Sequence, residues 1–165
     1  MSLFDMFKPN LELTKLTDLT FDQLNKAGIK LILIDIDNTL VTWHSSQVLP
    51  ENIEWINQGK KLGYNFCLIS NNYFSSRLKS ISDQTGIPYA RGIIKPFKMM
   101  FKQALKMYNS QPSEAVMIGD QLFTDVLGAN RSGIMSVWVQ PLSQKEFFST
   151  KISRFFERLV LKRKK

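Results

Sequence analysis

Two carboxylates, Asp35 and Asp37, follow directly after the apolar and partly β-branched run 31–34, and Thr39 stands two residues further on. Side chains at positions i and i+2 of an extended segment share one face. If the run is a buried strand, both acids reach the rim of the core. Two anions in such a place are costly unless a cation or hydrogen bonds compensate them. The stretch therefore predicts a metal site.

Further polar residues stand where other predicted elements begin or end. They are Ser70 and Asn71 after an apolar run at 64–69, Lys95 at the start of a helical pattern, and Gly119, Asp120 and Asp125 after an apolar run at 115–118. Gathered in one crevice, they would provide acids for a metal, a hydroxyl and an ammonium for phosphate oxygens, and a further carboxylate for proton transfer. These are the groups that a phosphoryl-transfer site needs.

The elements that must position these residues alternate along the chain. Apolar runs predict strands at 31–34, 64–69, 87–90, 115–118 and 134–139, and helical spacing predicts helices at 16–27, 51–63, 75–85, 95–108 and 124–131. Such alternation predicts a Rossmann-like α/β fold, a parallel sheet with helices on both faces and right-handed crossovers. Ligands of these sheets bind outside the carboxyl ends of the strands, where the polar residues fall.

Taken singly, each of these residues has an ordinary explanation. Ser70 can cap a turn, Lys95 can be a solvated lysine, and Asp125 can be an acid in the first turn of a helix. Their occurrence together at the ends of elements favours a common site. Arg77, Arg91 and Lys98 also lie near predicted element ends, where they either bind a second anionic group or are solvated charges.

Composition limits the possibilities. With 165 residues, the chain has room for one domain, which we expect to consist of an N-terminal segment (1–28), a core (29–142) and a basic amphipathic C-terminal helix or tail (143–165). The single cysteine excludes an internal disulfide framework and fits a reducing cytosol. No signal peptide or apolar run long enough to span a bilayer is apparent, so a cytoplasmic protein is expected. The formal charge of +8 favours anionic partners.

Both ends of the chain allow two interpretations. Residues 1–10 alternate apolar side chains with few charges, and either dock on the domain or lie on a membrane. In the tail, apolar residues at 152, 155, 156 and 159 form one stripe, and residues 162–165 are all basic. Such a helix either covers the sheet or makes a peripheral contact through 151–165 with the anionic inner face of a membrane.

Four motifs in order resemble those of the haloacid dehalogenase (HAD) superfamily of phosphatases. They are DIDNT at 35–39, Ser70, Lys95, and GDQLFTD at 119–125, and the resemblance covers roughly residues 31–139. It implies an HAD-like fold in which Asp35 is the nucleophile that forms an aspartyl-phosphate, and Asp37 is the general acid and base.

The same resemblance implies the remaining roles and the cofactor. Mg²⁺ would be bound by the Asp35 carboxylate, the backbone carbonyl of Asp37 and the Asp120 carboxylate. Phosphate binding would fall to Ser70, Asn71 and Lys95, and supporting roles to Thr39, Gly119 and Asp125.

The chain looks capless, which bears on the substrate. Members of the superfamily that act on small metabolites usually carry a cap domain inserted between these motifs. Here residues 42–64 have room for one crossover helix, and residues 72–95 for one helix and a short strand. An open site excludes water poorly unless the substrate or a neighbouring subunit covers it. We therefore expect a large or surface-bound substrate, and leave open whether the protein is an oligomer.

Within the superfamily, IKLILIDIDNTLVTW at 29–43 and KPFKMMFKQAL at 95–105 resemble the YqeG-type subgroup of the capless subfamily IIIA. This subgroup is related to the phosphatidylglycerophosphate (PGP) phosphatases. The resemblance implies dephosphorylation of PGP in phospholipid biosynthesis. The alternatives are a capless phosphatase for a phosphoprotein, a nucleic-acid end or a soluble metabolite, and a non-catalytic binding module with the same fold. Nucleic acid is not the expected partner.

Overall fold

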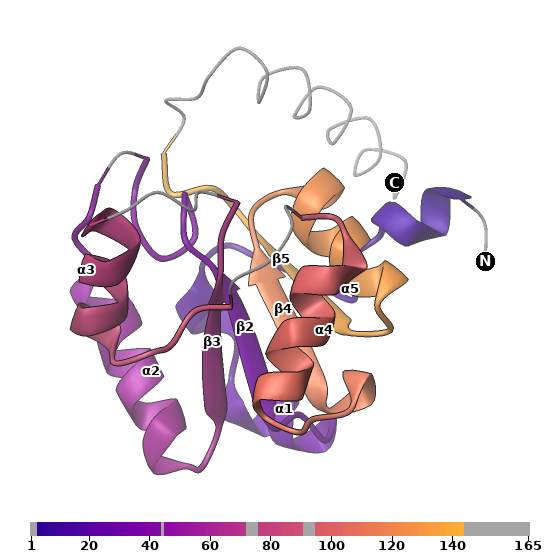
Figure 1. Cartoon of the computed structure of the whole chain (residues 1–165), viewed down its shortest axis with the longest axis horizontal. Coiled ribbons are helices and arrows are strands. Elements are labelled where there is room, and N and C mark those ends of the chain that lie inside the picture. Colours follow the sequence, from indigo (N-terminus) through magenta and orange to yellow (C-terminus); the bar gives the residue numbers. More distant parts are fainter. Residues whose placement is uncertain (1–2, 44, 72–75, 91–94, 144–165) are drawn as a thin grey trace.

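A computed structural model describes residues 3–43, 45–71, 76–90 and 95–143. Five parallel strands form one sheet in the order β1-β5-β4-β2-β3 (Figure 1). The strands are β1 (Leu11–Leu13), β2 (Leu31–Asp35), β3 (Asn65–Ile69), β4 (Ala115–Gly119) and β5 (Met135–Val139). The predictions made for the C-terminal tail lie outside the described residues.

Strand β2 is the centre of the site-forming part of the sheet. Leu31 pairs with Asn65 of β3 on one side and with Ala115 of β4 on the other, and Asp35 pairs with Ile69. The chain runs from β2 to β3 and later returns to β4 on the opposite side of β2. Such a reversal of strand order creates a crevice at the carboxyl ends of the strands.

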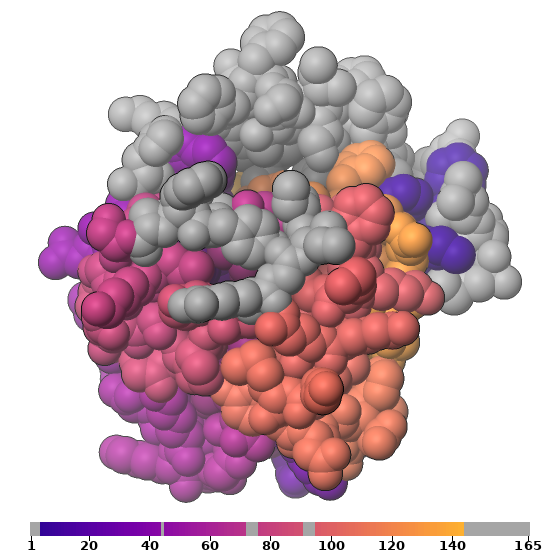
Figure 2. Space-filling model, in the orientation of Figure 1, coloured from indigo at the N-terminus to yellow at the C-terminus, as the bar shows by residue number. Residues whose placement is uncertain are grey.

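Helices cover both faces of the sheet. The three helices α1 (Phe21–Lys26), α2 (Pro50–Lys61) and α3 (Ser76–Thr85) pack on one face, and α4 (Lys98–Met107) and α5 (Leu127–Arg131) pack on the other. Alternate residues of β2 enter the two layers, with Ile32 and Ile34 facing α1–α3. In Figure 1, β3 lies between α2 and α3 on one side and α4 on the other, and Figure 2 shows the magenta and coral parts of the surface side by side. Because both faces are covered, every residue of β2 is buried.

Local sequence explains where several elements begin. The hydroxyl of Thr20 accepts a hydrogen bond from the backbone N–H of Gln23 and so caps α1. The predicted helix 16–27 is therefore divided into a short 3₁₀ turn, Leu16–Asp18, and α1. Helix α4 begins at Lys98 rather than at residue 95, and the predicted helix 124–131 begins as a π-helical turn, Leu122–Val126, before α5.

One predicted strand is shorter in the structure than expected, and one observed strand was not predicted. The predicted strand 87–90 is reduced to a single bridge between Leu68 and Tyr89. Pro88 lies inside this segment and has no N–H to donate to a ladder. Conversely, the sequence analysis did not predict β1, which has only three residues and pairs with β5 at the edge of the sheet. Short edge strands carry too few residues for a recognisable pattern.

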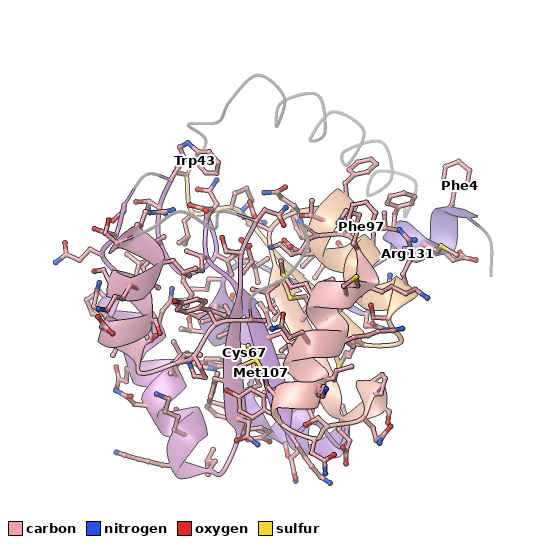
Figure 3. The ribbon with its side chains drawn as sticks, viewed as in Figure 1. Phe4, Trp43, Cys67, Phe97, Met107 and Arg131 are labelled. Atoms are coloured by element: carbon pink, nitrogen blue, oxygen red, sulfur yellow. The ribbon has the colours of Figure 1, made fainter. Side chains whose placement is uncertain are left out.

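The first residues of the described chain dock on the domain. A 3₁₀ helix, Leu3–Phe7, lies beside α5, and Asn130 Nδ2 donates hydrogen bonds to the carbonyl oxygens of Met6 and Lys8 at 2.8 and 2.9 Å. The ring of Phe7 packs against Phe123, with 5.0 Å between the ring centroids. Residues 3–8 therefore dock on the domain, as the first of the two interpretations expects. Phe4 nevertheless remains 59% exposed (Figure 3).

The connection from β2 to β3 contains α2 as its single α-helix, and no sizeable cap domain covers the described part of the sheet. The prediction of a parallel α/β sheet with helices on both faces and no sizeable cap domain is confirmed. Among the residues that the structure describes, no helix has the length and apolar character needed to cross a membrane.

Candidate active site

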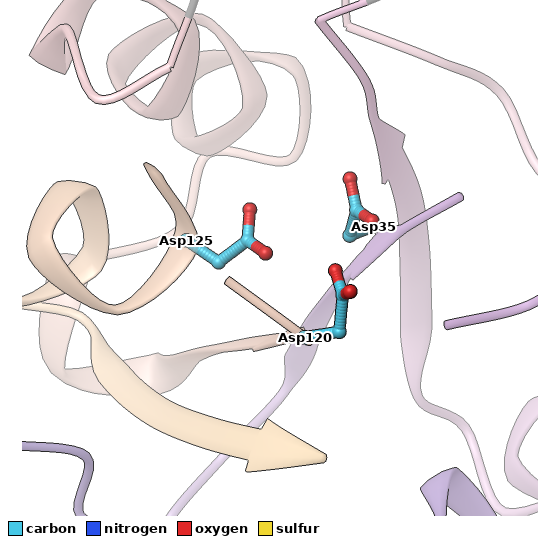
Figure 4. Close-up of side chains that lie close together, drawn as sticks. All are labelled: Asp35, Asp120 and Asp125. Atoms are coloured by element: carbon cyan, nitrogen blue, oxygen red, sulfur yellow. The ribbon is translucent and has the colours of Figure 1, made fainter. Parts of the chain in front are cut away.

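Three carboxylates meet at the carboxyl end of the sheet (Figure 4). Asp35 is the last residue of β2, Asp120 follows β4, and Asp125 lies on the π-helical turn. All three are buried, and one carboxylate oxygen of each lies within 4.8 Å of the other two. Because β2 and β4 are neighbours, their parallel pairing brings two of these acids together, and the turn after β4 folds the third back onto them.

Lys95 supplies the positive charge for this cluster. Its Nζ donates a hydrogen bond to Asp35 Oδ1 and another to Asp125 Oδ1 at 2.6 Å, and lies 3.4 Å from the carbonyl oxygen of Ile69. The ammonium group is almost completely buried. A buried charge is tolerated only when it is paired, so lysine and acids stabilise one another.

The electrostatics of the cluster shift the pKa of both partners. Burial raises the pKa of Asp35 from 3.8 to about 7, Asp125 and Asp37 add to this shift, and Lys95 opposes it. Burial disfavours the ammonium form of Lys95, but Asp125 and Asp35 outweigh burial, so the pKa of Lys95 is raised. The lysine therefore stays protonated at neutral pH, and its charge favours the ionised form of Asp35.

A second set of contacts holds Lys95 and Asp125 in place. The side-chain oxygen of Asn71 accepts a hydrogen bond from the Lys95 backbone N–H at 2.7 Å, and Asp125 Oδ2 accepts one from the Gln121 backbone N–H at 3.1 Å. At Gly119, a Cβ atom would lie 2.2 Å from Asp125 Oδ2. Glycine is therefore required there, because any side chain would displace the Asp125 carboxylate.

The two acids of the first motif lie in different environments. Asp35 is buried with Thr39 Oγ1 at 3.5 Å, whereas the side chain of Asp37 is 17% exposed and pairs with Arg77 at 2.6 Å. Strand β2 ends at Asp35, and Asn38 adopts a left-handed conformation with φ of 62°. The charge of Asp37 still contributes to raising the pKa of Asp35, and the expectation that both acids reach the rim of the core stays a prediction.

The structure therefore brings most of the predicted site residues together. Lys95, Asp35, Asp120 and Asp125 form one buried cluster, and Ser70 is buried where β3 ends. Asn71 braces the backbone of Lys95, and its role in phosphate binding stays a prediction. Sequence reasoning gave Arg77 no link to Asp37, because a lone arginine in a helix carries no spacing signal that connects it to a strand end.

Chemically, three carboxylates with convergent oxygens suit a hard divalent cation, which prefers oxygen ligands. The cluster also places a buried nucleophilic carboxylate beside an ammonium group, an arrangement that suits attack on an anionic phosphate.

Comparisons with known proteins bear on the fold and on the class of protein. A solved HAD phosphatase from Thermococcus onnurineus matches with a TM-score of 0.51 and 24% identity, over 62% of this chain and 51% of that one. The likeness concerns the fold. Together, the parallel sheet, the four motifs and the sequence relatives identify a phosphatase of the HAD superfamily, so the alternative of a non-catalytic module is set aside.

The family follows from the sequence itself. Residues 2–142 match the family model described as mitochondrial PGP phosphatase, and the chain belongs to this family. It is 35% identical to the probable phosphatase YqeG of Bacillus subtilis, over 94% of this chain and 90% of that protein. It is also 28% identical to the chloroplastic and mitochondrial PGP phosphatase 1 of Arabidopsis thaliana, over 94% of this chain and 47% of that protein.

Proposed function

We propose that this phosphatase hydrolyses phosphatidylglycerophosphate to phosphatidylglycerol and inorganic phosphate, with Mg²⁺ as cofactor and Asp35 as the nucleophile. The observation that supports this chemistry best is the buried cluster of Asp35, Asp120, Asp125 and Lys95 at the carboxyl end of the sheet. The name of the family and of the Arabidopsis relative supports the lipid substrate.

Asp35 and Asp120 would hold the metal ion together with the backbone carbonyl of Asp37, and the convergence of Asp125 on both carboxylates makes it a further candidate. When bound, Mg²⁺ neutralises negative charge on the phosphoryl oxygens. This leaves the protein to bind the substrate, to orient it and to move the proton.

In the first step, a carboxylate oxygen of Asp35 attacks phosphorus, the phosphorus–oxygen bond to the lipid alcohol breaks, and Asp37 gives its proton to the departing oxygen. In the second step, water attacks the phosphorus of the aspartyl-phosphate and Asp37 takes up the water proton. The bond to Asp35 then breaks and phosphate leaves. Each step leaves Asp37 in the protonation state that the other requires.

Lys95 and Ser70 would bind the transferring phosphoryl oxygens. Lys95 already touches the Asp35 carboxylate, so its ammonium group offsets the repulsion between an anionic nucleophile and an anionic phosphate. Ser70 follows β3, directly beside the end of β2. Their closeness to the end of β2, which carries the proposed nucleophile, supports this role.

The lack of a sizeable cap supports a substrate presented from a surface. A phospholipid headgroup at a membrane can cover an open site in the way that a cap domain does in other members. The net charge of +8 favours an anionic surface. We include in this proposal the peripheral membrane contact of residues 151–165.

The test is a substrate screen with the purified protein and Mg²⁺. Release of phosphate from PGP in mixed micelles is compared with release from nucleotides, sugar phosphates and phosphopeptides. We expect the highest kcat/KM with PGP. A higher kcat/KM with any soluble phosphate would overturn the lipid assignment, and retention of activity after removal of divalent metal with a chelator would overturn the cofactor.

The nucleophile is tested by Asp35→Asn, which keeps the shape of the side chain. We expect turnover to fall by about 10³-fold or more, with the fold retained because Lys95 keeps its hydrogen bond to Asp125. Asp22→Asn changes an acid in an exposed pair with Lys26 and is the matched control, for which we expect normal activity. Near-normal turnover of the Asp35→Asn protein would refute the assignment.

A further inference from the structure

Helix α3 is fastened to the segment that follows β2 through two side chains. Arg77 donates to Asp37 Oδ1 at 2.6 Å and, through Nε, to the carbonyl oxygen of Ser45 at 2.8 Å. Gln84, two turns further along the helix, donates to the carbonyl oxygen of Ser46 at 2.7 Å and accepts from the backbone N–H of Val48 at 3.1 Å. Both side chains therefore hold the same loop. Of these hydrogen bonds, only the one from Arg77 Nη2 reaches Asp37.

The geometry of the arginine makes this contact directional. A guanidinium group is planar, and its donors point in fixed directions. When Nε is held by Ser45, the plane of the group is set, and Nη2 can meet Asp37 from one direction only. The side chains of Arg77 and Asp37 are 21% and 17% exposed, so water screens this pair less than it screens a surface pair. The orientation of the Asp37 carboxylate is thus coupled to helix α3.

We propose that Arg77 is a positioning residue for the reaction, which sets the direction from which the Asp37 carboxyl group meets the leaving oxygen and the attacking water. This inference rests on the proposed role of Asp37 as general acid and base. Proton transfer by a positioned side chain contributes about 10²- to 10⁴-fold to a rate. A carboxyl group that has lost its fixed direction forfeits part of this contribution while substrate binding is unchanged.

A different role for Arg77 would be direct binding of a second anionic group of the substrate. The two roles predict different kinetics. An arginine that binds substrate contributes in the ground state, so its removal raises KM. An arginine that acts through Asp37 contributes to proton transfer, so its removal lowers kcat.

The experiment uses Arg77→Gln, which keeps an amide that can reach Ser45 but removes the charged fork, and Gln84→Ala as the matched control on the same loop. We expect Arg77→Gln to lower kcat for PGP by about 10-fold or more, with KM within about twofold of the unmodified protein. We expect Gln84→Ala to retain normal kcat. A raised KM with normal kcat in Arg77→Gln, or an equal loss of kcat in both variants, would overturn the proposal.

The leaving group provides a readout that a merely structural role would not change. In single-turnover measurements, the first step is followed with an alkyl phosphate, whose alkoxide needs a proton, and with p-nitrophenyl phosphate, whose phenolate leaves without one. We expect Arg77→Gln to slow release of the alkyl alcohol and to leave release of nitrophenolate nearly unchanged. Equal slowing of both would show that Arg77 does not act through proton transfer.

Asp37→Asn separates failure of this inference from failure of the proposed function. If Asp37→Asn retains near-normal turnover, the role assigned to Asp37 is wrong and the inference falls with it. If Asp37→Asn is inactive and Arg77→Gln is normal, only the inference fails. Because Arg77 acts through Asp37, the double variant should be no slower than Asp37→Asn alone. An additional, multiplicative loss would contradict this coupling.

Discussion

The two neighbouring strands β2 and β4 carry lysine–carboxylate pairs at both ends. Just before the strands begin, Lys30 and Glu114 pair at 2.6 Å, with side chains that are 69% and 27% exposed. Beyond their carboxyl ends, Lys95 and Asp125 pair at the same distance, with side chains that are 3% and 0% exposed. The same chemistry therefore occurs at opposite ends of the same pair of strands, once in solvent and once in the core.

The difference between these pairs lies in what happens when one partner is removed. In solvent, a lost partner is replaced by water and ions, and an exposed pair contributes little to stability. In the core, removal of one partner leaves the other as an uncompensated buried charge. Such a change is strongly destabilising. Keeping charged groups buried in this way costs stability. At the carboxyl end of this sheet, the proposed phosphoryl-transfer chemistry explains why the buried charges are present.

Replacing each lysine by methionine tests this comparison most directly, and we expect its largest effect at Lys95. Lys95→Met removes the ammonium group that pairs with Asp35 and Asp125. The free energy of unfolding of the metal-free protein should fall by about 3–5 kcal/mol, measured by denaturant titration at neutral pH. The identical change at the exposed pair, Lys30→Met, is the control. If both variants lose the same stability, burial does not distinguish the two ends.

The same variant provides a test of the metal site. With the Lys95 ammonium group removed, the carboxylates have more to gain from a bound divalent cation. Addition of Mg²⁺ should therefore raise the unfolding midpoint of Lys95→Met more than that of the unmodified protein. An equal or smaller shift would argue against a metal site among these acids.

Gly119→Ala should have the next largest effect, because the new Cβ would lie 2.2 Å from Asp125 Oδ2 and must displace that carboxylate from Lys95. A displacement of about 1 Å at a reacting centre can cost about 10²-fold in rate, and we expect kcat to fall by that order.

Gly59→Ala is the matched control for Gly119→Ala. Its Cβ would lie 2.6 Å from Phe66 Cζ, away from the site. Overpacking there should lower stability by about 1–3 kcal/mol and leave kcat unchanged. If Gly119→Ala loses stability but retains kcat, the position of Asp125 does not matter for turnover.

The comparison also shows what could be predicted from the sequence. The alternation of apolar runs and helical patterns predicts β2, β3, β4 and β5 along the chain, and a parallel sheet then puts Asp35 and Asp120 at the same edge. That β2 and β4 are neighbours, which brings the two acids together, comes from the structure. The spacing of Asp35 and Asp37 does not predict their different environments, because these depend on the burial of Asp35 and on the ion pair of Asp37 with Arg77. The bond from Arg77 to Asp37 depends on how α3 packs, which local sequence does not specify.

Residue types alone also fail to separate the two lysine–acid pairs. Glu114 and Asp125 are both acids close to strand β4, and Lys30 adjoins β2 as Lys95 adjoins α4. What separates them is burial, which results from the packing of the whole domain. The sequence analysis favoured Lys95 and Asp125 because they stand with other polar residues at the ends of elements and belong to an ordered set of four motifs. Cys67 shows the same effect of packing, since burial raises the pKa of its thiol to about 12 although its sequence context is an ordinary strand (Figure 3).

The smallest expected effect is at the exposed pair, where pH provides the test. The hydrogen bond from Lys30, together with that from the Gln111 backbone, lowers the pKa of Glu114 below its ordinary value of 4.5. A carboxyl group with a lowered pKa in the folded state adds stability above its unfolded pKa, and this stability is lost as the pH falls through the folded pKa. Thermal unfolding of Lys30→Met should therefore show a slightly lower midpoint than the unmodified protein at neutral pH. The difference should shrink with added salt, because salt screens exposed pairs, and vanish in acid below the lowered pKa. A difference that persists in acid would show that Lys30 stabilises the strand ends by packing of its aliphatic stem rather than by its charge.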